Sequence, residues 1–101
     1  RLEDARFEAS ARQLFNRPPH EIETDHLIYQ TLVGVLHRMG LNGKPVGMSF
    51  WTDAAILTQA GTPALLFGPR GAGLHSREEY VEIESVCVCR DVLVELAQNF
   101  C

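Results

Sequence analysis

The sequence predicts an α/β fold. Three observations support this prediction: apolar residues repeat at helical spacing over 24–39 and 84–100, a continuous apolar run occupies 64–67, and these elements alternate along the chain. The expected order is helix, short strand, helix, strand, loop, helix. Such alternation is typical of layered structures whose sheet has a parallel component. With 101 residues, the chain is long enough for one domain and too short for two.

The first half of the chain is expected to contain one helix. Residues 1–16 alternate imperfectly between apolar and polar side chains, which favours a strand, and the two prolines at 18–19 mark a connection. Residues 24–39 are predicted to form a helix, with Thr24 as its N-cap and Gly40 in its C-terminal cap. The apolar face of this helix would consist of Leu27, Ile28, Leu32, Val35, Leu36 and Met39.

A turn and a shorter helix follow. Residues 41–47 favour a turn, with a short strand near Val46, and a second helix is expected from about residue 53 to residue 60. Ser49 or Thr52 is suited to cap that helix. Their hydroxyl groups, together with backbone N–H groups, are also candidates to hold a substrate carboxylate.

Two neighbouring side chains allow more than one interpretation. Asp53 is interpreted as a carboxylate that stabilises the start of the second helix, and a general base or a metal ligand is the alternative. Trp51 is either the wall of a pocket or part of the core, and the sequence does not separate these two roles.

The apolar run at 64–67 lies between a proline and a glycine, as expected for a strand that is buried on both faces. In open α/β sheets, ligands bind beyond the carboxyl ends of strands. A glycine-rich loop follows this strand directly and leads to His75. Its glycines, which allow positive φ and close approach to a ligand, are Gly68, Gly71 and Gly73.

His75 is the candidate metal ligand of this loop. Neutral imidazole is the commonest metal ligand, and Glu78 or Glu79 could orient its second nitrogen. A lone histidine in a glycine-rich loop is, however, more often a turn residue. The chain contains no HxH, HExxH or CxxC spacing, and a catalytic zinc needs three protein ligands. The loop also matches neither the phosphate-binding GxxxxGK[ST] pattern nor GxGxxG.

The last predicted helix, 84–100, carries two of the three cysteines. On a helix, Cys87 and Cys89 would point about 200° apart, so they would share neither a disulfide nor a metal. With Cys101 they are interpreted as reduced thiols of a cytoplasmic protein. The apolar face of this helix would consist of Val86, Cys89, Val92, Leu93, Leu96 and Phe100.

Charge and hydropathy exclude two classes of partner. The formal net charge is −4, and the few basic residues are scattered, which argues against nucleic acid. No apolar run approaches the roughly 20 residues that a membrane-spanning helix needs. We therefore expect neither a nucleic-acid partner nor a membrane partner.

The segment "GMSFWTDAAILTQAGTPALLFGPRGAGLHSREEYVEI", residues 47–83, resembles part of a known family. It is similar to the C-terminal catalytic segment of the zinc-dependent amidohydrolases and exopeptidases that include acetylornithine deacetylase and succinyl-diaminopimelate desuccinylase. The resemblance covers about residues 20–101. The matching motifs, in order, are Thr52-Asp53, Gly61-Thr62-Pro63, Ala64 to Phe67, Gly68-Pro69, Gly71 to Gly73, His75, and Glu79-Tyr80-Val81.

This resemblance implies a fold and a set of site residues. Residues 18–101 would be the C-terminal segment of a catalytic domain, part of a three-layer sandwich, and residues 1–17 the last strand of an inserted lid domain. His75 would be a ligand of a two-metal zinc site, with cobalt or manganese as alternatives. The substrate-binding residues would be Ser49, Trp51, Thr52, Gly68, Gly71 and Gly73. No catalytic residue is expected in this segment.

The resemblance also implies a function. The enzyme would hydrolyse the amide bond of N-acyl amino acids or dipeptides, as a deacetylase, desuccinylase or peptidase. The family's HxD motif and its catalytic Glu-Glu pair have no counterpart at the matching positions, so the chain would need the remainder of the catalytic domain and be inactive alone. The enzyme could also form a homodimer. The alternative is a non-catalytic α/β module for binding or oligomerisation.

Overall fold

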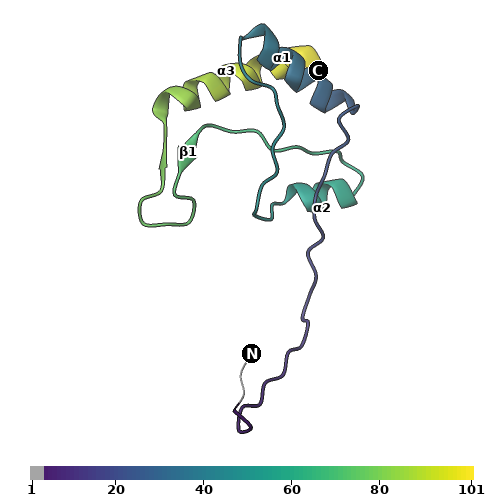
Figure 1. The fold of residues 1–101 in the computed structure, drawn as a ribbon. Helices are drawn as coiled ribbons and strands as arrows, with labels where there is room; N and C mark the ends of the chain where they lie inside the picture. The colour runs from purple at the N-terminus through teal and green to yellow at the C-terminus, as the bar shows by residue number, and fades with distance from the viewer. Residues whose placement is uncertain (1–3) are drawn as a thin grey trace.

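The computed structural model describes residues 4–101. It contains three helices and one small sheet, and Figure 1 shows the N-terminal end of the chain extending away from the rest of the molecule. The elements are α1 (Leu27–Arg38), α2 (Ala54–Gln59), β1 (Gly71–Ala72), β2 (Tyr80–Val81) and α3 (Ile83–Phe100). The structure is therefore α/β in content, as the sequence predicts.

The core lies where α1 packs against α3 (Figure 1). Val35 and Val92 have no exposed surface, and they meet between the two helices together with Leu32 and Leu36. The partly buried side chains that pack around this cluster are Leu41, Leu65, Phe67 and Leu96. Helical spacing in the sequence correctly predicts both helices and the centre of each buried face. Five residues also expected on these faces are exposed instead: Leu27, Met39, Val86, Leu93 and Phe100.

The two ends of α1 differ in how well the sequence predicts them. At the C-terminal end, Gly40 has φ 71° and the Leu41 N–H donates to the Leu36 carbonyl at 2.8 Å, as in a glycine-terminated helix. At the start, the N-cap is His26 and not the expected Thr24. Its Nδ1 accepts a hydrogen bond from the Ile28 N–H at 3.3 Å. A turn from Glu23 to His26 delays the start of the helix, because the His26 N–H bonds the Glu23 carbonyl.

The helix α2 is shorter by one residue at each end than expected. Asp53 is its N-cap, and the Asp53 side chain makes no capping hydrogen bond. The prediction that Ser49 or Thr52 caps this helix is therefore wrong. Ala54 and Ala55 are buried and fix the first turn of α2 against the body of the molecule.

The strand expected at 64–67 does not form. Leu65 and Phe67 pack against the helix pair, but Leu66 is 47% exposed. A strand requires a neighbour that completes its backbone hydrogen bonds, and no described residue pairs with this segment. The strands expected within 1–16 and near Val46 are also absent from the described residues, 4–101, and residues 1–3 lie outside them.

The one sheet within residues 4–101 is the antiparallel pair β1–β2, with Gly71 opposite Val81 and Ala72 opposite Tyr80. The expected parallel component is thus wrong for this chain. The described residues instead form a short antiparallel hairpin with two residues in each strand, which begins inside the predicted glycine loop.

The molecule is open and leaves much apolar surface uncovered. Its radius of gyration is 19.2 Å, whereas a compact domain of this length has about 13 Å. The large exposed apolar side chains include Ile83, Val86, Leu93 and Val94 on α3 and Leu66 in the extended segment. Among the described helices, none has the length and apolar character that crossing a membrane requires.

Candidate functional site

The glycine-rich loop forms a hairpin in which each glycine has a different environment. Of the three glycines that could adopt positive φ, only Gly73 does so, at 74°. Gly71 is instead required by close strand approach, because a Cβ there would collide with the Tyr80 carbonyl oxygen. At Gly68 an added Cβ would meet no atom of the described residues within 4 Å.

The base of the hairpin is attached to the first turn of α3. The Arg70 N–H donates to Ser85 Oγ at 2.9 Å, and the Glu82 N–H donates to the Arg70 carbonyl at 2.9 Å. The Arg70 guanidinium also pairs with the Glu82 carboxylate at 2.8 Å. These contacts fix where the hairpin leaves α3, and therefore where its loop can present a side chain.

His75 lies in that loop with an unusual backbone conformation. Its φ is 64°, in the left-handed region, which is uncommon for residues other than glycine and is often found at functional sites. The His75 N–H donates to the Glu79 carboxylate at 3.3 Å, and the Ser76 N–H donates to the Gly73 carbonyl at 2.8 Å. The sequence suggested that Glu78 or Glu79 would orient the imidazole of His75. The structure shows instead that Glu79 accepts a hydrogen bond from the His75 backbone. The imidazole is exposed.

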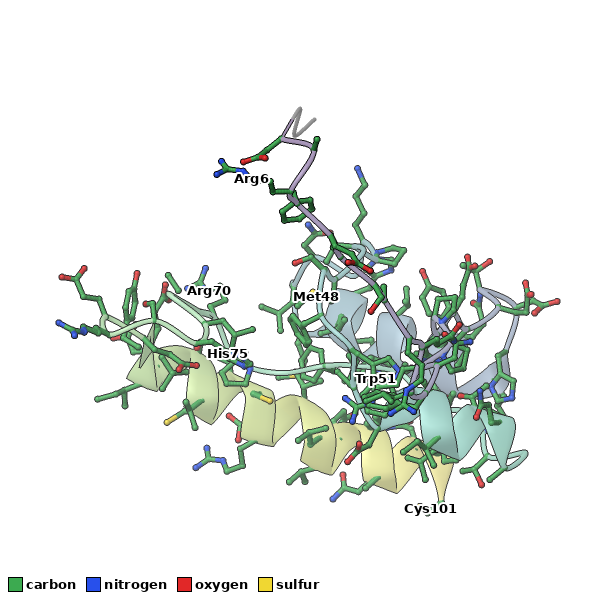
Figure 2. All side chains as sticks on the ribbon, turned by 90° about the horizontal axis from the view of Figure 1, so that it is seen from below. Arg6, Met48, Trp51, Arg70, His75 and Cys101 are labelled. Atoms are coloured by element: carbon green, nitrogen blue, oxygen red, sulfur yellow. The ribbon has the colours of Figure 1, made fainter. Side chains whose placement is uncertain are left out.

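The structure brings together most of the predicted substrate-binding residues, but not all of them. Five share the lining of one large hollow: Ser49, Trp51, Thr52, Gly68 and Gly71. Gly73 and His75 lie outside that lining. Figure 2 shows His75 beside the hairpin and Trp51 elsewhere along the molecule. The residues of the predicted site thus fall into two parts in this chain, the lining of the hollow and the histidine loop.

Trp51 makes contacts that sequence reasoning missed. Its indole N–H donates to the Pro18 carbonyl at 3.2 Å, and the Arg17 guanidinium carbon lies 4.6 Å from the centroid of the Trp51 ring. His20 Nε2 lies 2.8 Å from the Ala64 carbonyl oxygen. The Trp51–Pro18 contact spans 33 residues of sequence and the His20–Ala64 contact spans 44, so no local pattern could reveal them. The available signal was the pair of prolines, which predicts an extended segment able to contact distant residues.

The described residues fit a metal site only as a partial set of ligands. No group of three or more His, Cys, Asp or Glu side chains within 4–101 is placed to hold a metal ion. His75 presents one exposed imidazole, and Asp53 is exposed at the start of α2. The chemistry of the donors therefore allows His75 to serve as one ligand, provided that the others come from residues outside this chain.

Comparison with known proteins shows the family of the chain. It belongs to peptidase family M20/M25/M40, whose family model matches residues 6–99. A segment of 58 residues is 36% identical to acetylornithine deacetylase from Myxococcus xanthus, and this match covers 56% of the chain. The same match covers only 15% of the length of that relative. No solved structure matches. The family resemblance predicted from the motifs at 47–83 is thereby confirmed.

Replacing Gly73 with alanine should disorder the hairpin loop. The alanine would retain a strained φ, and its Cβ would lie 2.7 Å from the Glu78 carbonyl oxygen. We expect a loss of roughly 1–3 kcal/mol of local stability, measured as faster amide hydrogen exchange at Ser76 and Tyr80. Gly68→Ala is the matched control, since it should leave this exchange unchanged. Equal protection in the two variants would contradict the role assigned to Gly73.

Proposed function

We propose that this chain is the C-terminal part of the catalytic domain of a metal-dependent hydrolase. The enzyme would cleave the amide bond of N-acyl amino acids or dipeptides. The observation that carries the proposal is His75, an exposed imidazole held in a left-handed conformation on a hairpin attached to α3, in a chain that its peptidase family matches over 6–99. The name of the Myxococcus xanthus relative favours acetylated amino acids among the substrates.

In this proposal His75 supplies one ligand of a two-metal zinc site, for which cobalt or manganese is an alternative. When bound, such a metal polarises the substrate carbonyl and lowers the pKa of a water molecule. The chain's own part is to position groups. The hairpin would present the His75 imidazole, and Ser49 and Thr52, which line the hollow, would donate hydrogen bonds from their hydroxyl groups to a substrate carboxylate.

The remaining ligands and the general base would come from other parts of the enzyme. The large radius of gyration and the exposed apolar face of α3 support such missing neighbours, because isolated domains rarely leave so much apolar surface uncovered. We propose that residues 64–67 become a strand of a three-layer sandwich once neighbouring strands are present. Residues 1–17 would be the end of a lid domain. The three unpaired cysteines support a cytoplasmic location.

Two observations favour a second candidate function. The unpaired extended segment at 64–67 and the exposed apolar side chains of α3 also suit a non-catalytic module for binding or oligomerisation, including a homodimer. The two candidates differ in metal dependence, since such a module needs no ion at His75.

The direct test uses the longer polypeptide that carries this segment. We expect it to release a free amino acid from N-acetyl amino acids, to lose this activity when a chelator removes its metal, and to recover it with zinc. The 101-residue chain should show no hydrolysis under the same conditions. Absence of hydrolysis by the longer polypeptide over a panel of N-acyl amino acids and dipeptides, or hydrolysis that resists complete metal removal, would refute the proposal.

A further inference from the structure

The connection that precedes α1, whose Arg17 and His20 line the hollow, contacts distant parts of the chain at two places. The first is at Arg17, whose guanidinium carbon lies 4.6 Å from the centroid of Trp51 and 5.2 Å from the centroid of Phe15. Both distances are within the range of cation–π attraction. The Trp51 N–H also donates to the Pro18 carbonyl. The ring is thus held on its face by a cation and at its edge by a hydrogen bond.

The second contact is at His20, three residues further on. Its Nε2 lies 2.8 Å from the Ala64 carbonyl oxygen, which can only accept, so Nε2 carries the hydrogen. Nδ1 is buried and has no hydrogen-bond partner among the described residues. The bond to Ala64 is therefore the polar contact that holds this imidazole, and it ties the connection to the start of the 64–67 segment.

These contacts join the connection to two segments that contribute residues to the lining of the hollow. Trp51 belongs to the turn at 49–52, and Ala64 begins the segment that ends at Gly68. Arg17, His20, Trp51 and Gly68 all line the same hollow. One short connection thereby contacts both the turn that carries Ser49 and Thr52 and the segment that leads to the hairpin.

We propose that Arg17, Trp51 and His20 form a latch that holds the hollow in its substrate-binding shape, with Arg17 as a positioning residue. This inference rests on the proposed function, because the reaction gives the hollow its substrate. Arg17 does not touch the reacting amide in this scheme. Its planar guanidinium stacks on Trp51, which an ammonium group does less well, and the contact keeps the 49–52 turn in place.

The first test uses Trp51 as a probe, since it is the one tryptophan of the chain. In the 101-residue chain, Arg17→Met should shift Trp51 emission to longer wavelength and raise its acrylamide quenching roughly twofold, because the ring loses the cation that covers it. The Trp51 emission and quenching of Arg17→Lys should lie between those of the wild type and those of Arg17→Met. Arg12→Met is the matched control: Arg12 is exposed on the same connection and contacts no aromatic ring among the described residues.

The second test separates positioning from folding and uses the longer enzyme with its metal. Arg17→Met should raise KM about threefold to tenfold while kcat stays within about twofold, the size expected for losing one cation–π contact. Arg17→Lys should recover part of the KM, and Arg12→Met should change neither constant. A fall in kcat with unchanged KM would overturn the positioning role.

The outcomes distinguish the latch from the proposed function. If the wild-type enzyme hydrolyses its substrate but Arg17→Met and Arg12→Met give the same Trp51 emission and the same KM, the latch is refuted and the function stands. If the wild-type enzyme hydrolyses nothing, the proposed function and the positioning role both fail. The emission and quenching of Trp51 then still decide whether the latch exists as a structural contact.

Discussion

Replacing His75 with alanine is expected to lower kcat/KM of the longer enzyme by at least about a thousandfold, because losing a metal ligand removes several kcal/mol of transition-state stabilisation. The stoichiometry of bound metal should fall at the same time. The fold should be retained, since the imidazole is exposed and packs against nothing in the described core. The measurements are steady-state kinetics, metal analysis and circular dichroism on the same preparation.

The matched control is His37→Ala. His37 is also exposed, on the last turn of α1, and it has no part in the proposed site. We expect this variant to keep the kinetic constants and metal content of the wild type. Full hydrolysis by His75→Ala would refute the metal-ligand role of His75, and with it the observation on which the proposed function depends. Equal losses in the two variants would point to a general loss of folding instead.

Replacing Val92 with aspartate is expected to separate α1 from α3. Val92 has no exposed surface and lies in the cluster with Leu32, Val35 and Leu36. An unpaired carboxylate there costs roughly 3–5 kcal/mol, a large share of the stability of a domain this small. The expected result is a loss of helical circular dichroism and of cooperative unfolding in urea, measured on the 101-residue chain.

Val94→Asp provides the comparison within the same helix. Val94 is 52% exposed, so its carboxylate would remain in water. We expect this variant to unfold at nearly the same urea concentration as the wild type. Should Val94→Asp be as destabilising as Val92→Asp, the position of the core between α1 and α3 would be wrong, because both faces of α3 would then be buried.

The helices could be predicted from sequence because the signals that form them are local. Apolar residues at helical spacing identify the buried faces around Val35 and Val92, and Gly40 ends α1 where a residue with positive φ is needed. The run at 64–67 could not be predicted in the same way. Apolar composition makes a segment suitable for a strand, but only a neighbouring strand makes it one, and none is present alongside it in the described residues.

The candidate site, like the fold, could be predicted only in part. The order of motifs from Thr52 to His75 was enough to predict the family, because the motifs depend on residue type and spacing. The hairpin was missed because β1 and β2 have only two residues each. Strands this short show no alternation of apolar and polar residues that would identify them. The contacts of Arg17 and His20 were missed because they join residues that are far apart in the sequence, and only the tertiary structure brings these residues together.

The packing of α1 on α3 closes a single large loop, since residues 39–82 join the two helices. The entropy lost on closing a loop grows only with the logarithm of its length, so doubling this segment would cost about 0.6 kcal/mol. All the candidate site residues, from Ser49 to His75, lie inside this loop. Insertions in those stretches of the loop that do not pack against the helix pair would consequently be thermodynamically inexpensive, and proteins with this helix pair could acquire differently shaped pockets while keeping the same closure.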